Sequence, residues 1–133
     1  TINVLHARRQ SVLAASVDTF IADLKQQQLK TMVGDTEGRT VSDDYGIYFD
    51  ANSYTLFHGT YSSNEPGNFS ISLGDNVQFS DITFPASQIV FLKASGEIKN
   101  FNPNSNTITL IDTLSNRQKE LTINRYGVVT QVN

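Results

Sequence analysis

The side chains best suited to catalysis are few in this 133-residue chain. It has two histidines, His6 and His58, and no cysteine, which excludes a thiol nucleophile and a thiolate metal site. No serine stands in the G-x-S-x-G setting of a nucleophile elbow. Because the two histidines are far apart in sequence, we interpret each as a surface or packed residue. We therefore expect no enzymatic activity and no cofactor.

Three carboxylates are the best candidates for a catalytic acid–base pair. Asp43, Asp44 and Asp50 are close in sequence and could resemble paired carboxylates. They flank a predicted strand, where acidic residues are common in polar loops. We interpret them as loop residues.

Oxygen ligands for calcium are present in three places: Gly74-Asp75-Asn76, Asp81 and the Asn102–Asn106 cluster. None of them matches a twelve-residue EF-hand loop. Asn and Asp are also the residues that tight turns require. We predict no metal site, although the sequence alone leaves calcium open.

The charge balance argues against binding to polyanions. The net charge is −3, so no bulk attraction to nucleic acid or to an acidic membrane surface is expected. Arg117, Lys119 and Arg125 form the best alternative DNA-binding patch, but scattered cations are more typical of a solvated hairpin end. No run reaches the roughly 20 apolar residues that span a bilayer.

A long helix is predicted over residues 4–33, a run without Gly or Pro. Apolar residues recur there at steps of three and four, which predicts one core-facing stripe. Residues 1–12 are less apolar, and we expect them to form an exposed helical stem. The expected stripe is Leu13, Val17, Phe20, Ile21, Leu24, Leu29, Met32 and Val33; the expected polar face is Asp18, Asp23, Lys25, Gln26, Gln27 and Lys30.

After Gly34 the pattern changes to the alternation of β-strands. Residues 45–49 and 54–58 predict a hairpin, and residues 107–111 are expected to face residues 121–124 across another loop. Shorter strands are predicted near residues 69–73, 77–84, 89–92 and 128–130. A helix followed by antiparallel strands predicts an α+β fold in which the helix covers a sheet. We predict one domain, with a helical part over residues 1–33 and a β head over residues 34–133.

The order of these segments resembles that of type IV pilin-like proteins, specifically the minor pseudopilins of the H-subunit and FimT-like class. The resemblance is carried by LAASVDTFIADLKQQQLKTMV, GIYFDANSYTLFHG, IVFLKASGEI, NTITLID and ELTINRYGVV, and it covers most of the chain. It implies that a prepilin peptidase removes a leader, and that an apolar N-terminal half-helix, lacking here, precedes this soluble part. The chain would then be a piece of a longer protein.

The resemblance implies a structural role in filament assembly. The missing half-helix would anchor the subunit in the membrane, and the head would lie on the extracytoplasmic side of the cell envelope. Val4, Leu5, Val12 and Leu13 would belong to the stem, whereas Val17, Phe20, Ile21 and Leu24 would pack on the sheet. Partners would be other pilin or pseudopilin subunits of a type II secretion system or a pilus, and the fragment alone is expected to be monomeric.

DNA capture in natural transformation is the alternative function, since some FimT-like minor pilins serve it. Those proteins typically carry arginines after the terminal glycine. Here Gly127 is followed by Val128, Val129, Thr130 and Gln131, which argues against nucleic acid as a partner.

Overall fold

The computed structural model of the chain describes the backbone of residues 2–133 and the side chains of residue 8 and residues 10–133. In this part of the chain, one α-helix precedes eight strands and a short 3-10 turn. Every strand pair is antiparallel, so the predicted α+β class is confirmed. The elements are α1 (Ile2–Val33), β1 (Tyr45–Phe49), β2 (Ser53–His58), β3 (Phe69–Ser72), β4 (Val77–Ile82), η1 (Pro85–Ser87), β5 (Gln88–Phe91), β6 (Thr107–Asp112), β7 (Gln118–Ile123) and β8 (Val129–Val132).

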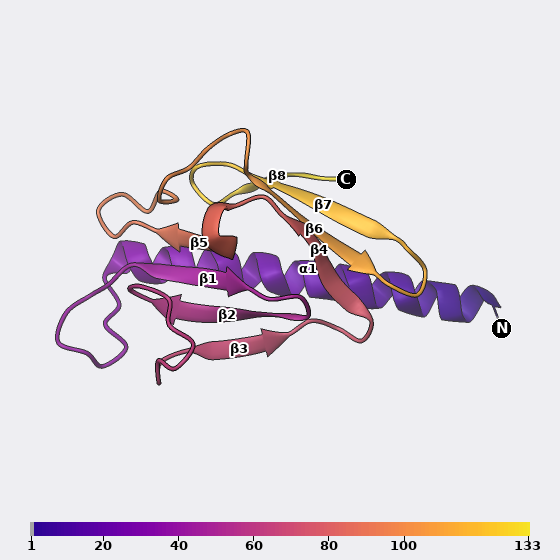
Figure 1. Cartoon of the computed structure of the whole chain (residues 1–133), viewed down its shortest axis with the longest axis horizontal. Coiled ribbons are helices and arrows are strands. Elements are labelled where there is room, and N and C mark those ends of the chain that lie inside the picture. Colours follow the sequence, from indigo (N-terminus) through magenta and orange to yellow (C-terminus); the bar gives the residue numbers. More distant parts are fainter. Residues whose placement is uncertain (1) are drawn as a thin grey trace.

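The strands form two four-stranded sheets with the orders β3-β2-β1-β5 and β4-β6-β7-β8 (Figure 1). The predicted hairpin is present as β1 and β2, with Tyr45 opposite His58 and Phe49 opposite Tyr54. The second predicted pairing is also present, with Thr107 of β6 opposite Thr122 of β7. Alternation along the sequence was therefore sufficient to place these strands.

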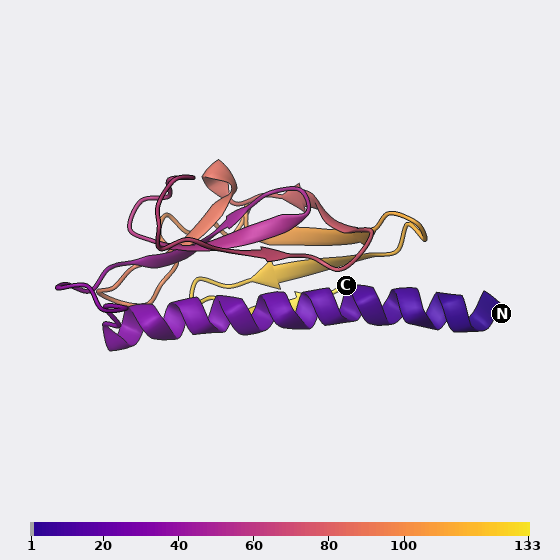
Figure 2. The same ribbon diagram turned by 90° about the horizontal axis from the view of Figure 1, so that it is seen from below.

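The helix α1 lies along one side of both sheets, and its N-terminal end extends beyond them (Figure 2). Packing joins α1 mainly to β1 and β6, with further contacts to β4 and β5. The helix thus covers the inner face of each sheet, and a single core forms between them.

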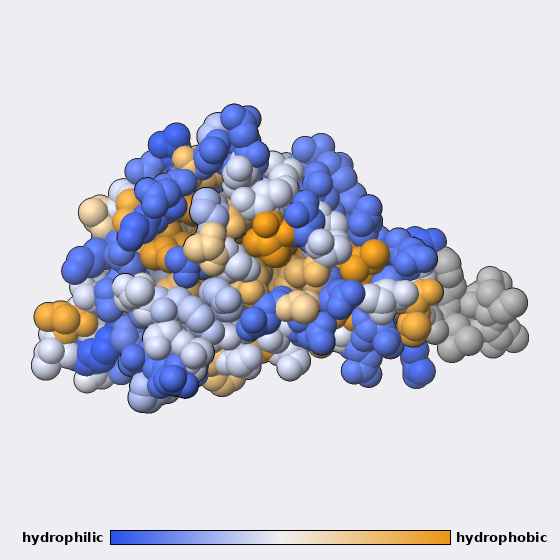
Figure 3. All heavy atoms as spheres, viewed as in Figure 1, coloured by the Kyte–Doolittle hydropathy of each residue, from blue (hydrophilic) through white to orange (hydrophobic). Residues whose placement is uncertain are grey.

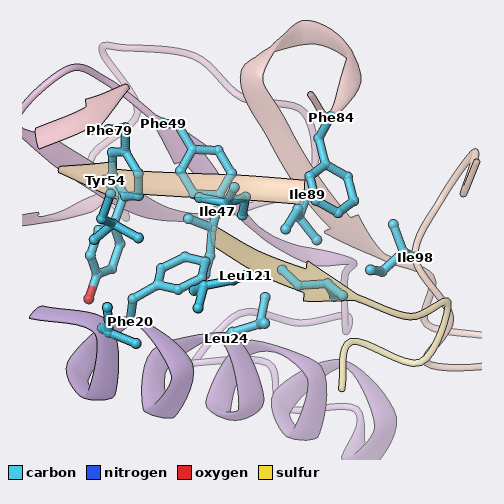
Figure 4. Packing of buried hydrophobic residues seen from close by; sticks show 14 of the residues in the cluster. Phe20, Leu24, Ile47, Phe49, Tyr54, Phe79, Phe84, Ile89, Ile98 and Leu121 are labelled. Carbon is cyan, nitrogen blue, oxygen red and sulfur yellow. The ribbon is translucent and has the colours of Figure 1, made fainter. Parts of the chain in front are cut away.

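Aromatic rings occupy the centre of this core (Figure 4). The fully buried ring of Phe20 meets Tyr54 and Phe79 edge-on, with centroids 5.4 and 6.1 Å apart. Its centroid lies 5.6 Å from that of Phe49, which itself meets Phe79 edge-on. Such aromatic pairs contribute about 0.5–1.5 kcal/mol each beyond the burial of their area. Phe20 therefore joins the helix to both sheets.

Gly34 ends the helix as the sequence indicates. It adopts a positive φ of 71°, a conformation that glycine reaches without steric cost. The Asp35 amide donates to the Lys30 carbonyl at 3.0 Å, and the Gly34 amide donates to that of Thr31 at 3.3 Å. These bonds satisfy carbonyls that the end of a helix leaves open.

The expected core-facing stripe is wrong at the C-terminal end of α1. Leu29, Met32 and Val33 are 49%, 57% and 76% exposed, whereas Gln27, expected on the polar face, is 1% exposed. A step of three or four residues from Leu24 leads to Gln27 or Gln28, and the next such step leads to Thr31. Helical geometry therefore turns these polar positions inward. The continuous buried row is Leu13, Val17, Phe20, Leu24, Gln27 and Thr31.

Candidate functional site

The N-terminal end of α1 divides into a projecting part and a packed part. Arg8, Gln10 and Ser11 are exposed, and burial of the α1 side chains begins at Val12 and Leu13. Among the described side chains, the head is first contacted at Gln10, whose side-chain amide lies 2.6 Å from Nη1 of Arg117 in the loop before β7. Residues 2–11 extend over about 15 Å at the helical rise of 1.5 Å per residue. The name stem is kept for this projecting part of α1, residues 2–11.

The assignment of Val12 and Leu13 to the stem is wrong. Leu13 is 3% exposed inside the core, and Val12 is half-buried against it. A Cβ on Gly74 would lie 2.5 Å from Cγ1 of Val12, and the Gly74 amide donates to Ser16 Oγ at 3.0 Å. This turn fixes where the helix leaves the head. The side chains of Val4 and Leu5, the other two residues assigned to the stem, lie outside the described residues.

The four residues predicted to pack on the sheet all contact the core. Val17, Phe20 and Leu24 are 6%, 0% and 1% exposed, and Ile21 is half-buried against the cluster. They follow the steps of three and four that put side chains on one helix face.

A buried amide joins the middle of α1 to the backbone of the first sheet. Gln27 Nε2 donates to the carbonyl oxygens of Gly46 and Phe57, at 2.7 and 3.3 Å. Thr31 Oγ1 donates to the Gln27 carbonyl at 2.9 Å and accepts from the Tyr45 amide at 3.1 Å. These bonds satisfy buried polar groups and fix the register of the helix on the sheet. The sequence signal was the position of both residues in the row of Leu24.

A second polar contact joins α1 to β2. The Tyr54 hydroxyl donates to Asp23 Oδ2 at 2.6 Å, while the ring is fully buried. Burial raises the pKa of Tyr54, and the neighbouring Asp23 carboxylate raises this pKa further. Asp23, expected to face water, instead anchors the tyrosine.

The loop after α1 is held by a third polar cluster. The Tyr45 hydroxyl donates to the Asp35 carbonyl at 2.6 Å and accepts from Arg39 Nη2 at 3.0 Å. Glu37 pairs with Lys30 at 2.9 Å and with Arg39 at 3.3 Å. Partial burial acts to raise the pKa of Glu37, but the two cations outweigh it and the pKa falls below its ordinary value.

His58 stands between two carboxylates. Its Nδ1 lies 3.3 Å from Asp43 Oδ2, and its Nε2 lies 3.9 Å from Glu65 Oε1. A histidine oriented by an aspartate is one half of a nucleophilic triad, but Glu65 rather than a nucleophile is the group facing Nε2. The arrangement ties the loop after β2 to the loop before β1. The side chain of His6 lies outside the described residues.

The candidate acid–base and calcium ligands do not converge. The strand β1 lies between Asp44 and Asp50, which places them roughly 20 Å apart along an extended chain. Asp75 and Asn106 stand at opposite ends of the β4–β6 pair, because Val77 faces Asp112 and Ile82 faces Ile108. Among the described residues, no three His, Asp or Glu side chains are grouped as a metal would require.

The three cations of the alternative DNA patch are dispersed. Arg117 precedes β7, Lys119 lies on it, and Arg125 follows its other end, so β7 separates the two arginines. Arg125 Nη1 lies 3.7 Å from Glu97 Oε1, and its guanidinium lies 5.5 Å from the Phe101 ring centroid. The described residues therefore present no continuous basic surface at this patch.

No known protein family, curated protein or solved structure matches this chain. Within the described residues, no helix combines the length and the apolar character that a membrane crossing requires.

Proposed function

We propose that this chain is the head and stem of a minor pilin or pseudopilin, a structural subunit of a type IV pilus or type II secretion pseudopilus. The observation that carries the proposal is the division of α1. Its packed part fixes the head from Val12 to Thr31, while the stem projects beyond both sheets (Figure 2). A helix held in this way can continue into a filament while its head stays on the surface.

The attachment of the helix to the head supports a mechanical role. Apolar burial of Leu13, Phe20 and Leu24 is combined with the buried bonds of Gln27. A filament subunit must transmit load from its helix to its head, and bonds distributed along the helix resist sliding better than apolar contact alone. The proposal therefore assigns the helix–sheet contact the role of joining stem and head.

In this proposal the protein is not an enzyme, and its partners are other filament subunits. A prepilin peptidase processes it, and an apolar N-terminal half-helix anchors it in the membrane with the head on the extracytoplasmic side. It acts in filament initiation or at the tip, and the soluble part alone is monomeric. This last expectation follows from its net charge of −3.

The test is deletion of the gene followed by complementation. We expect loss of surface filaments, or of secretion, and recovery with the full-length chain. A control variant, Gln118→Ala on the exposed start of β7, should restore function fully. Normal filaments and normal secretion in the deletion strain would contradict the proposal.

A further inference from the structure

A cleft of about 320 Å³ opens near sheet β3-β2-β1-β5, between the loop after β2 and the segment around η1. Gln88 and Val90 of β5 line it, together with Tyr61 and Asn100 from the surrounding loops. In Figure 2, η1 stands above the sheets on the side away from α1. Figure 3 shows that face, with apolar side chains exposed between hydrophilic loops near β1 and β5.

One wall of the cleft is a fixed aromatic ring. The ring of Tyr61 is stacked on that of Tyr48, with centroids 3.9 Å apart and planes within 5° of parallel. The rings of Phe57 and Tyr61 also form a T-shaped pair, at a centroid distance of 5.4 Å. Because two other rings hold Tyr61 in place, a ligand that contacts its ring would lose little free energy to the ordering of side chains.

Four polar side chains at the cleft form no side-chain hydrogen bond with the described part of the protein. They supply two amides, a hydroxyl and an ammonium group; Gln88 is half-buried and the other three are exposed. All four can therefore bind solvent or a ligand. The four residues are Thr60, Gln88, Lys99 and Asn100.

The backbone around the cleft is strained. Ala86 and Asn100, which line it, and Ser87 next to Ala86 have φ values of 56°, 56° and 54°. Asparagine reaches this left-handed region readily, whereas Ala86 and Ser87 adopt it at a cost, and such strain is concentrated at binding sites in many proteins. The Ser87 hydroxyl donates to the Phe49 carbonyl at 2.9 Å, which holds the strained turn in place.

We infer that this cleft is a binding site for a neutral saccharide. A sugar ring has an apolar C–H face that suits the Tyr61 ring and hydroxyls that suit free amides such as Gln88 and Asn100. Asp43 and Asp44 outnumber Lys99 at the cleft, which disfavours an anionic ligand. Both carboxylates already accept hydrogen bonds within the protein, from the Asp44 and Lys93 amides, which reduces their attraction for a cation. The inference does not depend on the proposed role in a filament.

The test is an NMR titration of the ¹⁵N-labelled chain with maltotriose, cellotriose and chitotriose, each in a separate experiment. We expect at least one trisaccharide to give saturable shifts at the amides of Thr60, Gln88 and Asn100, with a dissociation constant in the millimolar range. The double variant Gln88→Ala, Asn100→Gly should weaken this binding by about tenfold or more, which corresponds to the loss of one to two hydrogen bonds. Glycine at position 100 keeps the positive φ accessible, so the fold should not change.

The matched control is Gln118→Ala, which removes an amide from β7 in the other sheet and should leave the titration unchanged. The absence of saturable shifts with all three trisaccharides would overturn the inference. Shifts that persist undiminished in the double variant, or that map outside the cleft, would overturn it as well.

Discussion

The side-chain amide of Gln27 donates to the backbone carbonyl of Gly46 at 2.7 Å, in the buried contact between α1 and β1. The glycine itself is required at this point. A Cβ on Gly46 would lie 2.6 Å from the Ile89 carbonyl oxygen and 2.7 Å from the Phe57 ring, so only glycine fits there. The amide and the glycine together fix the height at which the helix crosses the sheet.

The first prediction concerns this buried amide. Gln27→Met keeps the length of the side chain but leaves the carbonyls without their donor, so the free energy of unfolding should fall by about 1–3 kcal/mol. Urea unfolding measures it. Gln26→Met, one position earlier on the exposed side of α1, is the control and should change stability by less than about 0.5 kcal/mol. Equal losses in the two variants would mean that the amide does not anchor the helix.

The second prediction concerns the apolar row of α1. Leu24→Asp would place a charge at a position that is 1% exposed, and we expect it to cost about 4 kcal/mol or more. Leu29→Asp is the same substitution at a position that is 49% exposed, and it should cost less than about 1 kcal/mol. Arg8→Ala on the stem should be nearly neutral. Thermal unfolding of the three variants measures these effects. Similar melting temperatures for both aspartate variants would contradict the packing of Leu24 in the core.

The third prediction concerns pH and Tyr54. Because its pKa is raised above the ordinary 10.0 in the folded chain, the unfolded chain ionises first. The contribution of this tyrosine is therefore complete below about pH 10 and is lost as the pH rises further. Burial is also the main cause that raises the pKa of Tyr45 and of Tyr61. Both tyrosines therefore contribute to the same loss of folding stability at alkaline pH.

The Tyr54→Phe variant isolates the contribution of the Tyr54 hydroxyl to folding stability. It should cost about 1.5–3 kcal/mol near neutral pH, where the hydroxyl donates to Asp23, and should weaken the alkaline dependence. Urea unfolding between about pH 8 and pH 11 measures both effects. If the free energy of unfolding fell with rising pH as steeply in the variant as in the wild type, Tyr54 would not contribute to the pH dependence.

The fourth prediction separates assembly from DNA capture. Since β7 lies between Arg117 and Arg125, duplex DNA should bind no more tightly than about 10⁻⁴ M at physiological salt. Fluorescence anisotropy measures this. Micromolar affinity that disappears on replacing Arg117, Lys119 and Arg125 would make the protein a DNA receptor.

Local sequence patterns were sufficient to predict most elements of the fold. Alternation placed the β1–β2 and β6–β7 pairs, and the glycine at position 34 marked the helix end. The division of the strands into two sheets was not predicted, because it depends on which edges meet in space. The face of α1 near its C-terminal end was misjudged because residue type was weighed above position: Leu29 is exposed and Gln27 is buried.

The sequence did not predict the candidate cleft, and the reason is a different one. Its residues come from four separate segments, so no spacing in the sequence brings Tyr61, Gln88 and Asn100 together. Asp43 and His58 are likewise joined only by the β1–β2 pairing. Sequence patterns report neighbours along the chain, whereas these groups are neighbours only after folding.

The central claim, that the stem joins a filament while the head remains outside, is tested most directly by site-specific cross-linking. The chain has no cysteine, so single cysteines can be introduced in the full-length protein, Ser11→Cys in the stem and, as control, Ser63→Cys in the exposed loop after β2. In isolated filaments the stem cysteine should cross-link to another subunit, and the loop cysteine should remain accessible to a soluble thiol reagent. A stem cysteine that stays uncross-linked and fully accessible in intact filaments would contradict the account.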